Sequence, residues 1–368
     1  MLVSMPPETT MPAEFTVMAM IWPTRIGSGP QAVLSIESKI APTPFILGLD
    51  EAGRPTVKVQ MLDGDSTECC LPNPVSERRW SRLWASFSQH SGELRVGILQ
   101  DRFDDTASTT CTESTALAEQ KISSIIVAAC DDGERHMHFN GKIERPTIYS
   151  TYLGPDMLFD NADITTAPVF ACWDFSKEVS STHVIDTGVN ELHGTLINYP
   201  ARAMTGANWD GSEMCWRHAP QQYGAIHFHE DDIYDFEWET DFSFTVPQNL
   251  RSGVYGIRLK HGKYHDTIPL FVCPPLGQRT SRLCLLVSTF TYTVYGNHAR
   301  PDYDASWQDK INAWDAYPWN PAQHLHYGCS TYNFHSDRSG ICHASHRRPL
   351  FNLRPGYLTF GANTCSGL

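Results

Sequence analysis

Short apolar segments separated by turns recur from Phe15 to Tyr149, and this pattern constrains the fold more than any other feature. Phe15–Trp22 alternates with a period of two and ends at Pro23. Comparable segments follow at Phe45–Leu49, Leu83–Phe87, Leu94–Ile98 and His138–Pro146. A period of two is typical of strands, and helical periodicity is scarce here. The pattern predicts a β-sandwich.

Two motifs in this region resemble the concanavalin A-like, laminin-G-type jelly roll. The first is Phe-Thr-Val-x-Ala-x-Ile-Trp-Pro at its beginning, and the second is Phe-Asn-Gly-Lys-Ile, which ends at Ile143. The resemblance implies that residues 1–155 form a jelly-roll sandwich.

The character of the chain changes between Asp160 and Pro275. A stretch rich in Trp and His leads to two segments, Gly253–Leu259 and Ile268–Val272, with a turn signal at His261-Gly262 between them. These segments read as paired strands. We therefore predict a smaller, β-rich junction domain over residues 156–275.

The last segment has the pattern of an α/β domain. Leu283–Val287 is an apolar run of the kind that forms a buried parallel strand, and the polar run Ser288–His298 follows it. Ligands of open α/β sheets bind beyond the carboxyl ends of strands. Asp302–Asn320 has partial helical spacing before prolines interrupt it. One strand cannot bury a sheet, so we expect residues 276–368 to be the first part of an incomplete catalytic domain.

The predicted fold class is therefore multidomain and mainly β. A hydrophobic fraction of 41% suits packed cores, and a formal charge of −13 argues against nucleic-acid or anionic-membrane partners. No apolar run approaches the ~20 residues of a membrane span. The N-terminus lacks the features of a secretion signal, and the 11 Cys residues have no regular spacing. These features predict a cytoplasmic protein with reduced thiols.

Two histidines in Ala225–His229 are candidate metal ligands. A strand through this segment places His227 and His229 on one face, beside a run of acidic residues. Such a pair could bind zinc or iron, but a catalytic site needs a third protein ligand, which the sequence does not identify. The alternative is that both imidazoles form hydrogen bonds at a domain junction. The acidic residues themselves read as a solvated or arginine-paired surface.

Tyr292, Tyr295 and Tyr332 are the second group of candidates. A buried tyrosine usually serves the core, with its hydroxyl hydrogen-bonded. Phenolate oxygen is also a hard ligand suited to ferric iron, and a bound metal can polarise a carbonyl and activate water. The residues alone leave both interpretations open.

A family resemblance separates these alternatives. The segments that carry it are Trp173–Ser176, Pro200–Gly206, Trp209–Gly211, Ala225–His229, Val246-Pro247, Arg251–Tyr255, Thr289–Tyr292, Tyr295–Asn297, Ser330–Asn333 and Cys342–Pro349. Together they resemble the large (β) subunit family of bacterial N,N-dimethylformamidases, and the resemblance is colinear from the jelly roll to the last residue.

The resemblance implies a mononuclear ferric iron held by two tyrosines and a glutamate, and hydrolysis of a small N-substituted amide to an acid and an amine. The tyrosines correspond to Tyr292 and Tyr332, with Tyr295 as the alternative to Tyr292. The family's glutamate lies in a later portion of the domain, which this chain does not contain. We therefore expect a truncated chain that is inactive alone.

The resemblance also implies a small (α) subunit as a partner, and homo-oligomerisation. Six further polar residues are expected around the metal or the substrate: Thr291, Asn297, His298, Asn333, His335 and His346. A different functional class stays open at this point. The jelly roll could be a carbohydrate- or protein-binding module joined to a vestigial catalytic domain.

Overall fold

The computed structural model describes residues 1–38, 43–60, 65–100, 105–112, 121–160, 164–299, 305–350 and 352–358. Its contacts divide the chain into two compact units, Met1–Asp232 and Ile233–Leu368. The sequence suggests three domains, with boundaries near residues 155 and 275. In the structure, the strands that follow residue 155 join the sheet of the first unit, and residues 233–275 group with the second.

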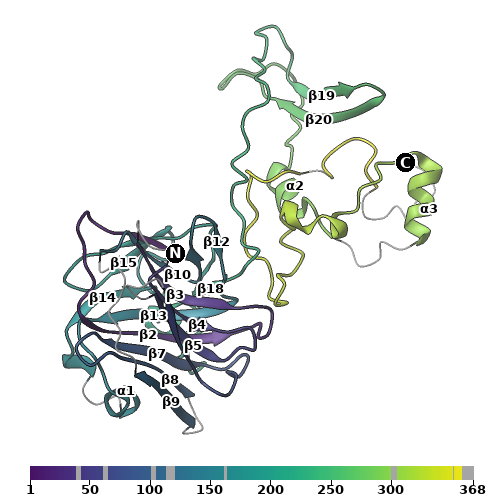
Figure 1. Cartoon of the computed structure of the whole chain (residues 1–368). Coiled ribbons are helices and arrows are strands. Elements are labelled where there is room, and N and C mark those ends of the chain that lie inside the picture. Colours follow the sequence, from purple (N-terminus) through teal and green to yellow (C-terminus); the bar gives the residue numbers. More distant parts are fainter. Residues whose placement is uncertain are drawn as a thin grey trace. The chain divides into compact units, whose positions relative to one another are not determined.

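The first unit is a sandwich built from one long antiparallel sheet, so the predicted mainly β, jelly-roll-like fold is confirmed (Figure 1). Its path doubles back, and β5 (Pro55–Gln60) and β6 (Ser66–Cys70) pack over β8 (Glu93–Gln100) and β9 (Asp105–Thr112). The first part of the path runs, in spatial order, through β6 (Ser66–Cys70), β5 (Pro55–Gln60), β4 (Phe45–Leu49), β3 (Gln31–Glu37), β10 (Ser124–Val127), β1 (Leu2–Ser4), β16 (Gly194–Thr195) and β15 (His183–Asp186).

The second part continues through β14 (Val169–Asp174), β13 (Gly141–Tyr149), β2 (Glu14–Pro23), β7 (Ser81–Ser88), β8 (Glu93–Gln100) and β9 (Asp105–Thr112). The sheet branches at β13. Residues 141–144 of β13 pair with β18 (Ala225–Phe228), whereas residues 147–149 pair with β14. An irregularity separates the two pairings, where Arg145 has a positive φ and Pro146 has no N–H to donate. β17 (Ala201–Met204) completes this edge beside β18.

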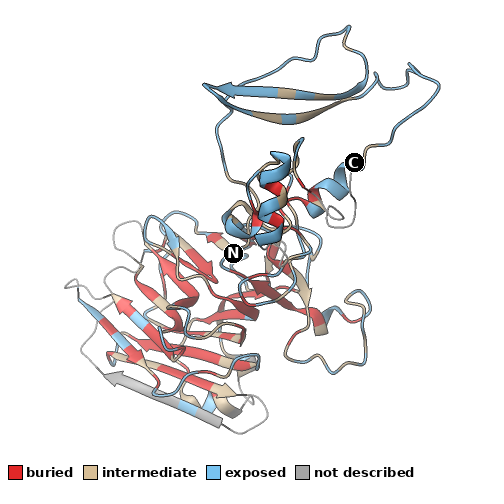
Figure 2. Ribbon diagram, turned by 90° about the vertical axis from the view of Figure 1, so that its right-hand side faces the viewer, coloured by how far each residue is buried: buried red, intermediate tan, exposed pale blue. Residues whose placement is uncertain are grey.

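The core lies between the two parts of the sheet, where Figure 2 shows buried residues on most strands. Alternation along β2 buries Phe15, as the sequence predicts. Its ring contacts Phe45 of β4 edge-on at 5.3 Å and Phe87 of β7 at 5.6 Å. Later strands add to the same core cluster through Trp173, Phe175, Val184, Ile226 and Phe228. The core therefore depends on residues up to β18.

A second apolar cluster covers the outer face of β7. Trp84 is fully buried there against residues of and around α1 (Pro155–Asp160). Its indole lies over Gly97, its register partner on β8. A Cβ atom on Gly97 would lie 2.0 Å from Trp84 Cζ2. The glycine is therefore required for space.

We expect Gly97→Ala to destabilise the first unit by about 2–3 kcal/mol, because the methyl group can only be accommodated by moving a buried indole. The control is Gly154→Ala, since a Cβ there meets no atom within 4 Å. That variant should change the free energy of unfolding by less than about 0.5 kcal/mol. Thermal and denaturant unfolding of both variants check the prediction, and equal stabilities would contradict it.

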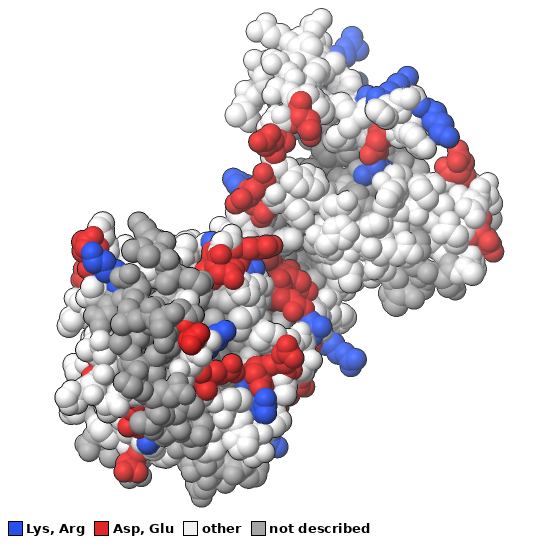
Figure 3. Space-filling model, viewed as in Figure 1, with Lys and Arg blue, Asp and Glu red and all other residues white. Residues whose placement is uncertain are grey.

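Shorter elements complete the first unit. A small ribbon pairs β11 (Cys130–Asp131) with β12 (Arg135–His136), and two 3₁₀ turns lie at Ile164–Thr166 and Pro220–Tyr223. Acidic side chains gather on the face of this unit seen in Figure 3, in keeping with the charge of −13. Those cysteines whose side chains are described form no disulfide. Among the described residues, no helix has both the length and the apolar character needed to cross a bilayer.

The second unit contains a hairpin of β19 (Gly253–His261) and β20 (Tyr264–Val272), which confirms the predicted pair and its turn. It also contains α2 (Thr289–Tyr295), α3 (Ala305–Trp314) and 3₁₀ turns at Pro321–Gln323 and Leu325–Tyr327. α3 lies within the predicted helical segment, whose residues 302–304 are outside the described ranges. Residues 359–368 of the third predicted domain are also outside them.

The predicted buried strand at Leu283–Val287 is wrong. The segment is not a strand, and its leucines are exposed, with Leu286 at 89%. A parallel strand needs a neighbour in its sheet, and in the described part of this unit β19 and β20 pair only with each other. The polar run that follows is the helix α2, not a loop at a strand end.

Candidate functional site

Two of the candidate tyrosines lie face to face in the second unit. The rings of Tyr295, the last residue of α2, and Tyr332 have centroids 4.1 Å apart, with 16° between their planes. The Tyr295 hydroxyl is hydrogen-bonded to the Tyr332 side chain, which stabilises the neutral phenol and raises the pKa of Tyr295. Both rings are partly exposed, Tyr295 at 38% and Tyr332 at 52%. The structure thus places two phenol oxygens side by side at an accessible surface.

The segment around Tyr332 is fixed to the last turn of α2 by direct hydrogen bonds. Buried Ser330 donates from its hydroxyl to the carbonyl of Val294 at 2.7 Å, and Thr331 N donates to the same carbonyl at 3.1 Å. The Ser330 hydroxyl in turn accepts from Tyr332 N at 3.1 Å. Because Val294 precedes Tyr295, these bonds set the register of the two rings.

Asn297 lies two residues after the end of α2 and holds the surrounding loops. It has a φ of 59°, a conformation that asparagine tolerates better than most residues. Its buried side-chain amide donates to the carbonyls of Gly328 at 3.1 Å and Pro349 at 2.6 Å. Its backbone N–H donates to Asn352 Oδ1 at 3.0 Å. One residue therefore joins three segments that are distant in the sequence.

Arg348 makes the second such connection, and sequence reasoning missed it. Its guanidinium is buried and donates to the carbonyls of Gly328 at 2.8 Å, Cys329 at 2.7 Å and Thr293 at 2.6 Å. Burial lowers the pKa of Arg348 to about 10, which leaves it charged at neutral pH. The only signal in the sequence was its place in the Cys342–Pro349 motif. Asn297 and Arg348 form the framework that positions the tyrosine pair.

Tyr292 takes a different position. Its ring lies 6.2 Å from that of Phe271, in β20. Of the two alternatives, the structure brings Tyr295 to Tyr332 and directs Tyr292 toward the hairpin.

Comparison with known proteins finds relatives of this chain. Residues 201–367 match the family described as N,N-dimethylformamidase beta subunit-like, C-terminal. The chain is 32% identical to the N,N-dimethylformamidase beta subunit of Paracoccus aminophilus over 93% of its length, and 31% identical to that of an Alcaligenes species over the same share. The chain is related to the N,N-dimethylformamidase beta subunits. It spans about half of each relative, 49% in both cases.

Solved structures give only distant likenesses. A sialidase carbohydrate-binding module from Ruminococcus gnavus aligns with 44% of the chain and 92% of the module, at 16% identity and a TM-score of 0.36. A pentraxin from Limulus polyphemus aligns with 44% of the chain and 75% of the pentraxin, at 14% identity and a TM-score of 0.34. These likenesses are too remote to indicate function.

The other residues predicted from the dimethylformamidase resemblance occupy three kinds of position. The His298 ring is 6.2 Å from that of Tyr332. Asn333 exchanges two hydrogen bonds with the backbone of Ala299, so it supports the loop. His346 Nδ1 lies 3.2 Å from the Thr293 hydroxyl.

The remaining two predicted residues have no described contact with either phenol. His335 donates through its backbone N–H to Ser339 O at 2.9 Å. Thr291 is exposed on α2. Both lie in the same unit as the tyrosine pair.

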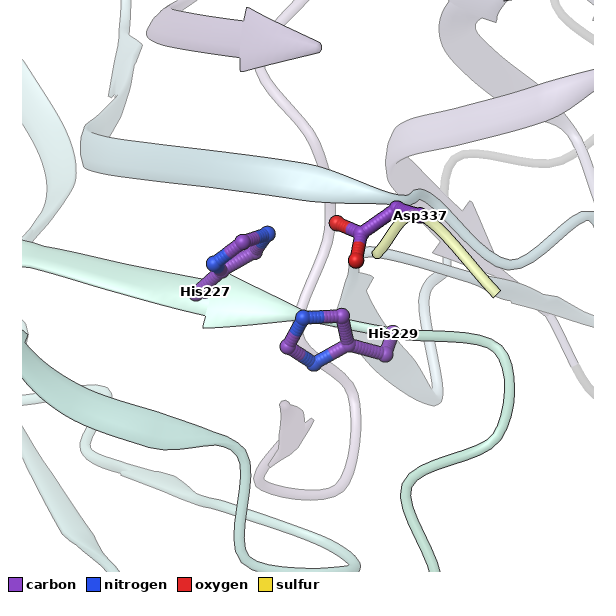
Figure 4. Close-up of side chains that lie close together, drawn as sticks. All are labelled: His227, His229 and Asp337. Carbon is purple, nitrogen blue, oxygen red and sulfur yellow. The ribbon is translucent and has the colours of Figure 1, made fainter. Parts of the chain in front are cut away.

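In the first unit, the predicted strand at Ala225–His229 is confirmed as β18, which ends at Phe228. His227 and His229 lie on one face of its end, with ring centroids 4.1 Å apart (Figure 4). The predicted pairing of acidic residues with arginine is also found, since Glu230 forms an ion pair with Arg25. The imidazole pair is separate in sequence and unit from the tyrosines.

A cleft of about 600 Å³ also opens over β4, β5 and β6. Its charged groups serve the fold. Asp50 accepts hydrogen bonds from Arg54, and Glu68 accepts one from Thr56 at 2.9 Å. Burial, with help from Glu37, raises the pKa of Cys130 to about 12, so this thiol is not a nucleophile at neutral pH. The cleft therefore offers weaker chemistry than the tyrosine pair.

Proposed function

We propose that this chain supplies the metal-binding part of an iron-dependent amidohydrolase that cleaves small N-substituted amides, such as N,N-dimethylformamide, to an acid and an amine. One observation carries the proposal. Two phenols, Tyr295 and Tyr332, are stacked and hydrogen-bonded inside the segment that matches the dimethylformamidase family.

The donor set fits ferric iron. Phenolate oxygens are hard ligands, and two of them held side by side can bind one hard cation by releasing their protons. The pair is also accessible, because about half of Tyr332 is exposed. We assign the two tyrosine ligands to Tyr295 and Tyr332, in preference to Tyr292, because only the former two are in contact.

Iron bound at this pair would act as a Lewis acid toward an amide carbonyl or a water molecule. The protein's own part is to hold the phenols in register. Ser330 fixes Tyr332 to the last turn of α2, and the framework of Asn297 and Arg348 fixes the loops behind it. His298, whose ring centroid lies 6.2 Å from that of Tyr332, is the candidate to carry a proton to the departing amine.

Ferric titration of the chain tests the ligand assignment. We expect a visible charge-transfer band from iron–phenolate bonding, and Tyr332→Phe and Tyr295→Phe should each remove most of it. Phenylalanine deletes the donor oxygen and retains the ring. Tyr292→Phe is the matched control on the same helix and should keep the band. If Tyr292→Phe loses the band and Tyr295→Phe keeps it, Tyr292 is the ligand and the assignment to Tyr295 is wrong.

Hydrolysis is a separate measurement. The described pair supplies two donors, and a stable mononuclear site needs at least one more, which the resemblance assigns to a glutamate in the later portion of the family's domain. We expect no amine release from dimethylformamide by this chain alone. Release at a rate that depends on Tyr332 would show that the ligand set is complete here.

We also propose that the chain works in a complex with a second, smaller subunit and further copies of itself. The relatives are named as beta subunits. Exposed apolar side chains in the second unit support the proposal, since Leu276, Leu283 and Leu286 are almost fully exposed. Side chains of this kind are typically covered by partner chains.

A further inference from the structure

The cleft over β4, β5 and β6 has a polar floor that the proposed function does not use. Val57 and Val59 of β5 are fully buried in the core, whereas Lys58 between them is exposed. On β6, Ser66 and Glu68 are exposed in the same alternation. Successive side chains of a strand point to opposite faces of its sheet, so the three exposed residues share the outer face. All three line the cleft.

The small ribbon of β11 and β12 forms one wall of the cleft. The ribbon lies against β3, the neighbour of β4, where Asp131 N donates to Glu37 Oε1 at 3.3 Å. Three residues of the ribbon line the cleft together with the floor: Cys130, Asp132 and His136. The polar floor is therefore part of a concave site with a wall, which is the shape of most small-ligand sites.

The charges of the cleft disfavour an anionic ligand. Lys58 is the one Lys or Arg among the described residues that line it. Its register partner on β6 is Glu68, so these two opposite charges stand side by side on the floor. Glu51 and Asp132 also line the cleft and leave it with a surplus of negative charge. Phosphate, sialic acid and uronic acid groups would be repelled here.

The floor retains hydrogen-bonding capacity for a ligand. The side chains of Lys58, Gln60 and Ser66 form no hydrogen bond with another described residue. Gln60 and Ser66 are register partners, so their polar groups are adjacent. An ammonium offers three donors, whereas an amide and a hydroxyl each donate and accept. This mixture suits a ligand whose own groups both donate and accept, as the hydroxyls of a sugar do.

Apolar side chains border the same floor. Ile46 of β4 is the register partner of Lys58 and lines the cleft, as does Met137, the residue after β12. Sugar rings have apolar C–H faces between their hydroxyls, and these side chains can cover such faces. The cleft measures about 600 Å³, within the ~300–1,000 Å³ that is usual for ligand sites.

From these features we propose that the cleft is a binding site for an uncharged oligosaccharide. The hydroxyls of the sugar would bind Lys58, Gln60 and Ser66, and its C–H faces would lie against Ile46 and Met137. A peptide strand fits less well, because strand addition uses a free sheet edge, whereas this site lies over a sheet face. The site belongs to the first unit and is independent of the proposed amidohydrolase function.

Calorimetric titration of the full chain tests the site. The probes are uncharged tetrasaccharides of glucose, mannose, galactose and N-acetylglucosamine, with 3′-sialyllactose as the anionic comparison. We expect at least one uncharged probe to bind with a dissociation constant of about 1 mM or tighter. The sialylated probe should bind at least about tenfold more weakly because of the rim carboxylates. Failure of all four uncharged probes, or a preference for the sialylated one, would overturn the proposal.

Three variants alter the floor in different ways. Lys58→Met removes the ammonium and keeps a long side chain, Gln60→Ala removes the amide, and Ser66→Tyr fills space above β6. Each should weaken binding of the uncharged probe about tenfold or more. Lys58 and Ser66 are exposed, so their variants should keep the melting temperature of the unaltered chain. Unchanged affinity in all three would show that the sugar binds elsewhere and contradict the site.

The matched control for Lys58→Met is Lys177→Met. Lys177 is also an exposed lysine of the first unit, and its ammonium lies 3.8 Å from Asp174 Oδ2. It does not line the cleft, so the affinity for the uncharged probe should stay the same. An equal loss in Lys177→Met would show that binding follows the overall charge and not the cleft, which would contradict the proposal.

Discussion

A fragment of residues 1–155 is expected to remain unfolded, whereas a fragment of residues 1–232 is expected to fold cooperatively. The shorter fragment contains the whole segment that resembles a jelly roll by sequence. It lacks β14 to β18, however, and with them the buried side chains of Trp173, Phe175, Val184, Ile226 and Phe228. Burial of one large apolar side chain stabilises a fold by about 1.5–3 kcal/mol.

Five such side chains together contribute on the order of 10 kcal/mol, which is comparable to the whole free energy of unfolding of a typical domain, about 5–15 kcal/mol. The shorter fragment would also leave one edge of β13 and one edge of β1 without a partner. Far-UV circular dichroism and thermal melting of the two purified fragments decide the matter. If residues 1–155 melt cooperatively near the melting temperature of residues 1–232, the shorter fragment already forms a complete sandwich. The prediction that folding requires the later strands would then be wrong.

Arg348→Met is expected to destabilise the second unit by about 3–5 kcal/mol. Methionine keeps much of the side-chain volume but removes three buried hydrogen bonds that the charged guanidinium donates to the carbonyls of Thr293, Gly328 and Cys329. A hydrogen bond to a charged group contributes about 1.5–3 kcal/mol. The loops behind Tyr295 and Tyr332 should then open. Hydrogen exchange and limited proteolysis of the full chain should report faster exchange and new cleavage after residue 233.

The neighbouring residue gives the control. Arg347 is exposed and pairs with Asp235 at 2.7 Å, and a surface ion pair of this kind contributes about 0–1 kcal/mol. Arg347→Met should therefore change exchange and proteolysis little. If the two variants behave alike, the buried guanidinium is not the connection that holds the tyrosine pair in place.

The strands of the first unit could be predicted because their side chains alternate with a period of two. Phe15–Trp22 indicates a strand and its buried face from local sequence alone, and it corresponds to a strand in the structure. Leu283–Val287 does not alternate between apolar and polar residues. An apolar run indicates only that the segment can be buried if a neighbouring strand or helix covers it. The wrong prediction there came from treating composition as if it identified a neighbouring strand.

The sequence predicted which types of residue form the candidate sites, but it did not predict which of those residues come into contact. Tyr292 and Tyr295 are three positions apart on one helix, so the sequence cannot decide which of them meets Tyr332. That choice is made by Ser330 and Arg348, through contacts with the last turn of α2. By contrast, the alternation along β18 predicts that His227 and His229 share a face.

The position of β1 has a consequence for how the protein is made. Leu2 pairs with Ile126 on one side and with Thr195 on the other, so β1 gains its second neighbour only after residue 195 has been synthesised. At ~5–20 residues per second, Leu2 waits roughly 10–40 s for Thr195. During that interval the second edge of β1 stays open to other nascent chains. Synthesis at lower temperature, or with more chaperone, should therefore change the yield of folded protein more than any codon or surface substitution within β1 itself.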